Sequence, residues 1–287
     1  MAEFVTPSLE IGLTPAFDWG ALSRAARDAA YNNTAAVPDV AALHEARTRA
    51  SVAVRAAHPG ALDLPYGPGE RNRIDVFPAT SAAAPCLVFI HGGYWQMNSK
   101  ESFACLGEGV RAHGWSAAFV GYSLAPQATL SQIVEEISAA LDWLAANGRC
   151  HGAGGPLVVS GWSAGGHLAA LALNHHAVIG GLGISGIYEL GPLRDTYLND
   201  KLALSDEQVA LLSPLRRPVV AKPMAITYGT SELPALVANS RKLHAYRAAA
   251  GAPGVLLPAP GRNHFNILDD LRGPDGILTR QLLVLAA

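Results

Sequence analysis

Short apolar runs, each long enough for one buried strand, alternate along this chain with longer segments of helical character. These runs are Cys86 to Ile90, Ala117 to Gly121, Leu157 to Gly161, Val178 to Ile184, Met224 to Tyr228 and Val255 to Leu257. Strands that are apolar throughout and separated by helices are typical of a mainly parallel sheet. An earlier alternating stretch, Asn72 to Phe77, predicts one more strand. The sequence therefore predicts an α/β fold with a mainly parallel central sheet flanked by helices.

One of the intervening helices can be read residue by residue. Its apolar residues recur at spacings of four, four and three, which places them on one face: Ile133, Ile137, Leu141 and Leu144. Thr129 with Gln132 predicts a capping box at its start, and Gly148 predicts its C-terminal stop.

The chain of 287 residues shows no internal repeat, low-complexity tract or long linker. We therefore expect a single domain over residues 1–287. Within it, residues 1–60 are expected to form a helical extension, with helices around Trp19 to Tyr31 and Asp39 to Ala56. Residues 186–215 separate two predicted strands and are expected to form a short lid.

The composition narrows the partners and the compartment. Half of the residues are hydrophobic and the formal net charge is -2, with no block of like charges, so we expect neither nucleic acid nor a membrane surface as a partner. Met1 to Ile11 lacks the pattern of a signal peptide, and no apolar run approaches the roughly 18 residues of a membrane helix. The cysteines, Cys86, Cys105 and Cys150, lack metal-ligand spacing and suit a reducing cytoplasm. A homodimer is compatible with these features, but they do not determine the oligomeric state.

Ser163 lies in Gly-Trp-Ser-Ala-Gly, directly after the predicted strand that ends at Gly161 and before a helix-like run from Leu168. A nucleophile at a tight strand-to-helix turn needs small residues on either side, because two backbone segments pass close by. Gly161 and Gly165 meet this need. We therefore predict that Ser163 is a nucleophile at the carboxyl edge of the sheet, against the alternative of an ordinary serine in a glycine-rich turn.

A second glycine-rich segment, His91-Gly-Gly-Tyr-Trp95, follows the predicted strand that ends at Ile90. A tetrahedral intermediate carries a negative oxygen that backbone N–H groups must stabilise, and consecutive glycines let the chain present them. Gly92, Gly93 and Ala164 are the predicted oxyanion-hole donors. The alternative is a flexible loop.

A general base and an acid complete the predicted site. In the chain order Ser, acid, His, the base is His264, in a loop just past the last predicted strand. The acid is expected after the strand that ends at Tyr228, where the segment Gly229 to Pro234 offers only Glu232. A surface role for this glutamate, with Asp195, Asp200 or Asp206 as the acid instead, is the alternative.

Three aromatic residues flank these segments: Tyr94, Trp95 and Trp162. Aromatic rings there favour stacking on an aromatic group of a substrate, so all three are candidate substrate-binding residues. Core packing is the competing explanation, above all for Trp162, because the residue before such a serine often packs inward.

These segments together resemble a known family. The box at His91 to Trp95, the segment Tyr122 to Pro126 and the turn at Gly161 to Gly166 look like those of the esterase/lipase group related to hormone-sensitive lipase, which implies the α/β-hydrolase fold. The segments Ser185 to Leu193 and Leu212 to Leu215 resemble the arylformamidase (kynurenine formamidase) branch. That resemblance implies hydrolysis of N-formylkynurenine or related formamides and esters, without a metal or another cofactor. Family members more often carry Asp at the position of Glu232.

The leading hypothesis is a serine hydrolase that cleaves small acyl groups from aryl amides or esters of small-molecule substrates. A general short-chain carboxylesterase and a catalytically inactive binding protein with this fold are the alternatives. A nucleotide-dependent oxidoreductase is excluded, because the glycine-rich segment His151 to Gly155 precedes a strand instead of following one.

Overall fold

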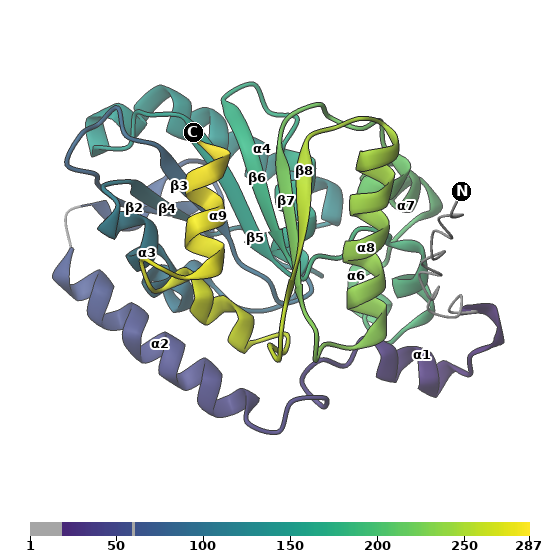
Figure 1. Ribbon diagram of the computed structural model, residues 1–287. Coiled ribbons are helices and arrows are strands. Elements are labelled where there is room, and N and C mark those ends of the chain that lie inside the picture. Colours follow the sequence, from purple (N-terminus) through teal and green to yellow (C-terminus); the bar gives the residue numbers. More distant parts are fainter. Residues whose placement is uncertain (1–18, 59–60) are drawn as a thin grey trace, which may run out of the picture.

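The computed structural model describes residues 19–58 and 61–287, and its centre is an eight-stranded sheet (Figure 1). The strands lie in the order β1-β2-β4-β3-β5-β6-β7-β8. Their bounds are Leu64–Pro65 (β1), Arg73–Phe77 (β2), Cys86–Ile90 (β3), Ser116–Val120 (β4), Leu157–Trp162 (β5), Val178–Ile184 (β6), Met224–Gly229 (β7) and Gly254–Ala259 (β8).

The pairing explains the apolar character of the strands. From β4 to β8 all neighbours are parallel, whereas β1 and β2 are antiparallel to their neighbours. In β3, Val88 lies between Ala118 of β4 and Val159 of β5, with all three side chains buried. Strands covered on both faces need apolar residues at every position. The structure confirms the predicted α/β-hydrolase fold, and it adds β1, which is too short to show in the sequence.

Helices cover both faces of the sheet (Figure 1). Their bounds are Arg24–Ala30 (α1), Val40–Ala57 (α2), Glu108–Ala112 (α3), Leu130–Asn147 (α4), Ala164–Ala172 (α5), Asn199–Leu202 (α6), Asp206–Leu212 (α7), Pro234–Ala249 (α8) and Ile277–Leu285 (α9). One hydrophobic cluster joins α4, α5 and α8 to one face, and a second joins α3 and α9 to the other. Alternate residues of β3 enter the two clusters, with Val88 in the first and Phe89 in the second.

The start and the end of α4 are both as predicted. Thr129 Oγ1 accepts a hydrogen bond from the Gln132 N–H, and the Gln132 side chain accepts one from the Thr129 N–H, so the capping box is present. The α-helix ends at Asn147 with Gly148 as its C-cap, and the chain continues as a 3-10 turn, Gly148–His151. Gly148 itself has right-handed helical angles, and the left-handed residue is Gly152, with φ of 73°.

The segment predicted to form a lid, residues 186–215, folds into short helical turns between β6 and β7. It includes α6 and α7, and much of it is packed into the first hydrophobic cluster through Leu193, Leu198, Leu202, Leu204 and Val209. Tyr197, in contrast, is 40% exposed. A lid function for this segment remains a prediction.

The structure describes part of the predicted N-terminal helical extension. Helices α1 and α2 lie within the expected extension, and α2 packs against the 3-10 segment Lys100–Gly107. The prediction about Met1 to Ile11 lies outside the described residues. Over residues 19–58 and 61–287, no helix combines the length and apolar character needed to cross a membrane.

Candidate active site

The turn between β5 and α5 holds Ser163 in an unusual backbone conformation. Its φ of 58° and ψ of -119° are rarely adopted by residues other than glycine, and its N–H donates to Ile184 O over 2.8 Å. Neighbouring backbone atoms leave no room for a side chain at either flanking glycine. A Cβ on Gly161 would lie 2.0 Å from Gly165 O, and one on Gly165 would lie 2.0 Å from Ile90 O. The motif is therefore a strained turn packed against the neighbouring strand.

The segment after β3 lies against this turn because β3 and β5 are adjacent in the sheet. A Cβ on Gly92 would lie 2.5 Å from Trp162 O and 2.9 Å from Ser163 Cβ. Gly93 has φ of 117°, in the region that favours glycine. Within the described residues, the N–H groups of Gly92, Gly93 and Ala164 donate to no protein acceptor. Free N–H groups beside a serine are what an oxyanion hole requires.

The backbone carbonyl of Gly92 accepts hydrogen bonds from two side chains. His91 Nδ1 donates to Gly92 O over 2.9 Å, and Asn98 Nδ2 donates to it over 3.0 Å. Burial lowers the pKa of His91 to about 4, so its ring is neutral at neutral pH. The Gly92 carbonyl and the Gly93 N–H belong to the same peptide group, so the orientation of this N–H is thereby fixed.

Tyr94 connects this segment to the N-terminal region. Its hydroxyl donates to Tyr31 O over 2.6 Å and accepts from Asn33 Nδ2 over 2.9 Å, and both side chains are buried. Tyr94 itself has φ of 50°. This anchor was not evident in the sequence, since nothing in the pattern pairs Asn33 with a residue 61 positions away.

Glu232 and His264 come from the loops after β7 and β8 and meet in a hydrogen bond. His264 Nδ1 lies 2.9 Å from Glu232 Oε2, and the two side chains are 4% and 0% exposed. The other carboxylate oxygen, Oε1, accepts from the Gly229 N–H over 2.6 Å and from Ser185 Oγ over 2.5 Å. Both oxygens of this buried carboxylate are therefore satisfied, as the burial of a charge demands.

Ser185 was missed in the sequence. It directly follows β6, the strand that lies between β5 and β7 in the sheet, and it has φ of 50°. A single serine after a strand carries no signal of a carboxylate partner 47 residues away.

The alternative acids lie elsewhere. Asp195 and Asp200 lie near arginines of the N-terminal region, Arg27 and Arg24, and Asp206 pairs with Arg194. These three carboxylates are 49%, 77% and 90% exposed. Each forms a surface ion pair, a type that contributes little to stability.

The loop that carries His264 is held from two sides. Trp162 Nε1 donates to His264 O over 2.7 Å, which ties the loop to the residue before Ser163. Arg47 of α2 donates through Nη2 to Phe265 O over 2.8 Å. The Arg47 side chain is buried, and its guanidinium lies over the rings of Trp162 and Phe103. Like the Asn33 contact, this one joins distant parts of the chain and was not predicted.

The three candidate substrate-binding aromatics are buried. Trp95 is 0% exposed and packs edge-on against His167, and Trp162 is 2% exposed and bonded to the His264 loop. Tyr94 is 8% exposed. All three rings contact protein in this structure, and a substrate role for them remains a prediction.

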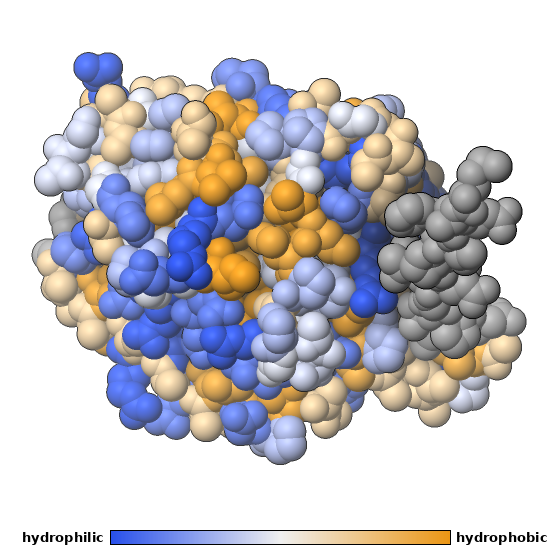
Figure 2. All heavy atoms as spheres, viewed as in Figure 1, coloured by the Kyte–Doolittle hydropathy of each residue, from blue (hydrophilic) through white to orange (hydrophobic). Residues whose placement is uncertain are grey.

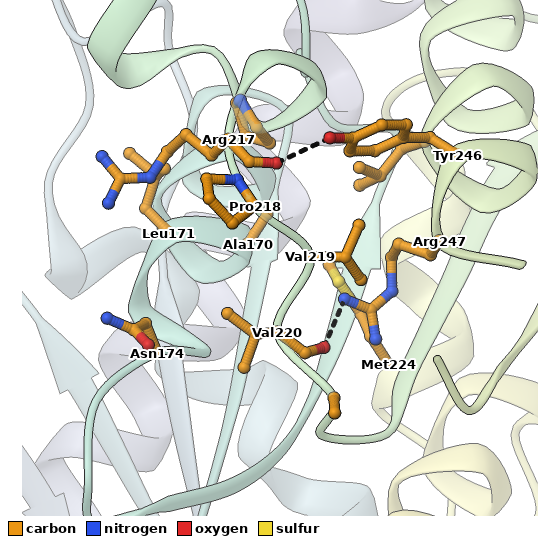
Figure 3. Close-up of a pocket in the computed structure, with 13 residues that line it drawn as sticks. Ala170, Leu171, Asn174, Arg217, Pro218, Val219, Val220, Met224, Tyr246 and Arg247 are labelled. Carbon is orange, nitrogen blue, oxygen red and sulfur yellow. Dashed lines mark hydrogen bonds between the residues drawn. The ribbon is translucent and has the colours of Figure 1, made fainter. Parts of the chain in front are cut away.

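The approach to the predicted nucleophile is narrow, because Ser163 is 2% exposed and His264 3%. A cavity of about 480 Å³ lies elsewhere, around Met224 at the amino end of β7 (Figure 3). Arg247 donates to Val220 O across it, and Tyr246 donates to Arg217 O. None of the predicted site residues lines this cavity.

Known proteins are similar to this chain in sequence. The BD-FAE family model matches residues 74–178. The kynurenine formamidase of Salmo salar is 30% identical over 239 residues, which cover 77% of this chain and 80% of that protein. The kynurenine formamidase of Danio rerio is 27% identical, with 93% and 97% of the two chains covered.

Solved structures extend the similarity over the fold. The "putative thioesterase" of Silicibacter sp. TM1040 is 28% identical and superposes with a TM-score of 0.80, covering 91% of this chain and 98% of that one. Esterase B of Lactobacillus rhamnosis, at 19% identity, has a TM-score of 0.68 over 87% and 97% of the two chains, and it supports the fold alone. Given the identity to the salmon enzyme and the coverage of its length, this chain belongs to the kynurenine formamidase family and is a hydrolase of the esterase and arylformamidase type.

Proposed function

We propose that this chain is a serine hydrolase that removes small acyl groups, such as formyl or acetyl, from aryl amides or esters. The proposed triad is Ser163, His264 and Glu232, and the proposed oxyanion-hole donors are the N–H groups of Gly92, Gly93 and Ala164. One observation carries the proposal. Ser163 lies in a strained turn after β5, beside free N–H groups, and the buried Glu232–His264 pair lies in the loops after β7 and β8 of the same sheet.

Each group has one task in the proposed reaction. Ser163 Oγ attacks the carbonyl carbon while His264 Nε2 takes its proton, and the carbonyl oxygen becomes an oxyanion held by the backbone N–H groups. His264 then returns the proton to the leaving amine or alcohol, whose bond to carbon breaks. Water attacks the acyl-serine in the same way and releases the acid. Glu232 orients the imidazole and stabilises its charged form, without taking the proton.

Two features support a small acyl group. Ser163 and His264 are almost buried, and the segment between β6 and β7 is packed into the core by several leucines. A long fatty chain needs an apolar channel, and the described cavity at Met224 lies at the other end of β7 from Glu232. The aromatic amine is proposed because relatives in the family are named kynurenine formamidases.

Ser163→Ala tests the nucleophile. We expect turnover to fall by about three orders of magnitude or more, with labelling by a fluorophosphonate probe abolished. Ser160→Ala is the matched control, because Ser160 lies in β5 just before Ser163 and its buried Oγ donates to Leu182 O of β6. Labelling that persists in folded Ser163→Ala, or that disappears in folded Ser160→Ala, contradicts the assignment.

The substrate is tested by comparing kcat/KM for N-formylkynurenine, phenyl acetate and p-nitrophenyl esters of increasing chain length. We expect the formamide and the short esters to be cleaved fastest. Ester turnover without formamide cleavage favours the second candidate, a general short-chain carboxylesterase. The 34% identity to esterase LipQ of Mycobacterium tuberculosis, over 119 residues, supports that candidate. Highest efficiency on long chains rejects both.

We further propose a homodimer that uses the edge strand β8. This strand ends the sheet, its Val255 is 41% exposed, and Val284 of α9 is 66% exposed. Figure 2 shows apolar surface over this part of the molecule. A dimer mass in light scattering that becomes monomeric in Val255→Lys supports this pairing, and a monomer at all concentrations rejects it.

A cytoplasmic location is proposed from the cysteines. Cys86 and Cys105 are buried and unpaired, and burial raises the pKa of Cys86 to about 11, which keeps it a protonated thiol. Cell fractionation of the native protein tests this location.

A further inference from the structure

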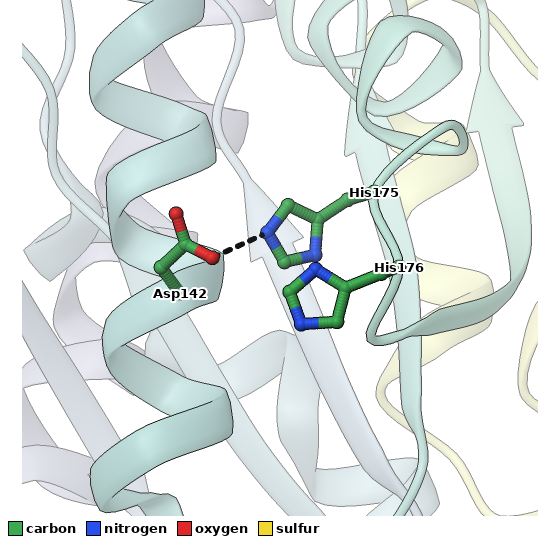
Figure 4. A group of neighbouring side chains, drawn as sticks. All are labelled: Asp142, His175 and His176. Carbon is green, nitrogen blue, oxygen red and sulfur yellow. Dashed lines mark hydrogen bonds and ion pairs between the residues drawn. The ribbon is translucent and has the colours of Figure 1, made fainter.

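Two histidines and an aspartate form a cluster that the proposed hydrolysis does not use. Asp142 lies on α4, and His175 and His176 lie in the turn between α5 and β6 (Figure 4). Each of the three offers one ligand atom, and these atoms all lie within 4.8 Å of one another. The imidazole rings of the two histidines are 4.5 Å apart and tilted by 32°.

The hydrogen bonds of His175 define which of its nitrogens carries the hydrogen and which carries a lone pair. The lone-pair nitrogen, Nδ1, accepts one long hydrogen bond, which a bound metal ion would replace. A carboxylate only accepts, so His175 Nε2 carries the hydrogen and donates to Asp142 Oδ1 over 3.1 Å. The Ala177 N–H donates weakly to Nδ1, over 3.3 Å, which agrees with a lone pair on that atom. Figure 4 shows this second nitrogen directed toward the His176 ring. The side chain of His175 is 8% exposed, so its orientation is restricted.

This pattern matches the support that proteins give to metal-bound histidines. A ligating imidazole usually donates its other N–H to a carboxylate, which fixes the tautomer and makes the ligand more basic. Neutral imidazole nitrogens and a carboxylate oxygen suit Zn²⁺ in particular. We propose that His175 Nδ1 and His176 bind a divalent transition-metal ion, typified by Zn²⁺, with Asp142 orienting His175.

The position of the cluster separates it from the proposed catalysis. It precedes Val178, the first residue of β6, whereas the predicted catalytic residues follow the carboxyl ends of the strands. Helix α5 begins directly after Ser163 and ends at Ala172, so the cluster lies beyond its far end. A bound ion would fix the turn before β6, which the hydrogen bond between His175 and Asp142 ties to α4. It is therefore expected to stabilise the folded chain and to take no part in hydrolysis.

A lysine side chain, Lys222, lies next to the cluster. Lys222 Nζ donates to the backbone carbonyl of His175 over 2.6 Å, so its charge lies close to the cluster. This charge opposes a second cation without blocking the imidazole nitrogens. Lys222→Met is accordingly expected to tighten Zn²⁺ binding.

The test is calorimetric titration of the chelator-treated full chain with ZnCl₂, in a Cys150→Ser background that removes the exposed thiol. We expect one equivalent of Zn²⁺ to bind, and this equivalent to be lost in His175→Ala and in His176→Ala. Asp142→Asn keeps an acceptor but loses the charge, and it is expected to weaken binding by about 10- to 100-fold. His244→Ala, a histidine of α8, is the matched control and should bind as the parent does.

Thermal unfolding supplies a second readout. Zn²⁺ should raise the Tm of the parent and of His244→Ala, and leave the Tm of the double variant His175→Ala/His176→Ala unchanged. The exposed His176 alone can be replaced without disturbing the hydrogen bond between His175 and Asp142, so a folding defect at His175 does not obscure the result. The proposal is overturned if the double variant binds as much Zn²⁺ as the parent, or if the parent binds none.

Discussion

On one side of Ser163 the acid is held by groups from neighbouring strand ends, whereas the glycine segment on the other side is held by residues of the N-terminal region. Glu232 Oε1 accepts from Gly229 and Ser185, and Oε2 faces His264. The hydroxyl of Tyr94, in contrast, is bonded to Tyr31 and Asn33.

The difference follows from what each side must do. A buried carboxylate is stable only when its oxygens are paired, so the acid side is saturated with hydrogen bonds. In the proposed oxyanion hole, the N–H groups of Gly92 and Gly93 must stay unpaired until a substrate oxygen arrives, so they cannot be held by bonds of their own. They are positioned through the Gly92 carbonyl and the side chain of Tyr94 instead.

The largest loss of turnover is expected from a change at Glu232. Glu232→Gln keeps the shape but removes the charge that favours the imidazolium, so kcat on phenyl acetate should fall by about three to four orders of magnitude. Circular dichroism checks that the variant is folded. Asp200→Asn, at an exposed alternative acid, is the control and should be silent. The reverse result would mean that the acid is misassigned.

Gly92→Ala tests the open side. The added Cβ meets Trp162 O at 2.5 Å, so the backbone must move and the N–H groups with it. We expect kcat to fall by about two to three orders of magnitude, the effect of losing an oxyanion donor. Gly273→Ala is the control, because the nearest heavy atom to its Cβ would be 3.9 Å away. Wild-type turnover in Gly92→Ala would remove this segment from the site.

Ser185→Ala tests how much one of the two hydrogen bonds to Glu232 Oε1 contributes to turnover. Glu232 Oε1 keeps the Gly229 N–H, so we expect a decrease of about tenfold in kcat, the effect of one hydrogen bond to a charged group. A positioning role also predicts a displaced acidic limb in the pH profile of kcat/KM, whereas a merely structural role leaves the profile in place.

The smallest effect is expected at the distant anchor. Tyr94→Phe removes a hydroxyl that makes two buried hydrogen bonds and leaves Asn33 Nδ2 without its acceptor, so we expect a stability loss of about 1–3 kcal/mol. Turnover should fall only a few-fold. Urea unfolding and kcat measure the two quantities. A loss of kcat as large as that of Gly92→Ala would show that the anchor alone sets the donor geometry.

The parts that could be predicted from sequence are those with a local pattern. The apolar runs predicted six strands of the sheet, and five of these, β3 to β7, are largely buried, which favours near-continuous apolar sequence. The glycines around Ser163 predicted the close approach that the structure shows, since only glycine fits there.

The remaining parts depend on contacts between distant residues. Ser185, Asn33 and Arg47 each support a predicted site residue or its loop, yet none lies near its partner in the sequence. The cluster of Asp142, His175 and His176 is of the same kind, because Asp142 meets His175 only through the packing of α4 beside α5. A single sequence carries no periodic signal for such pairs.

The hydrogen bond from Arg47 to Phe265 has a consequence for the order of events during refolding. It joins residues 218 positions apart, so the closure that forms it has a large entropic cost until the chain between is compact. The loop of His264 therefore reaches its final position late, after the central strands have assembled. Helical structure should return early in refolding from denaturant, and hydrolytic activity should return last.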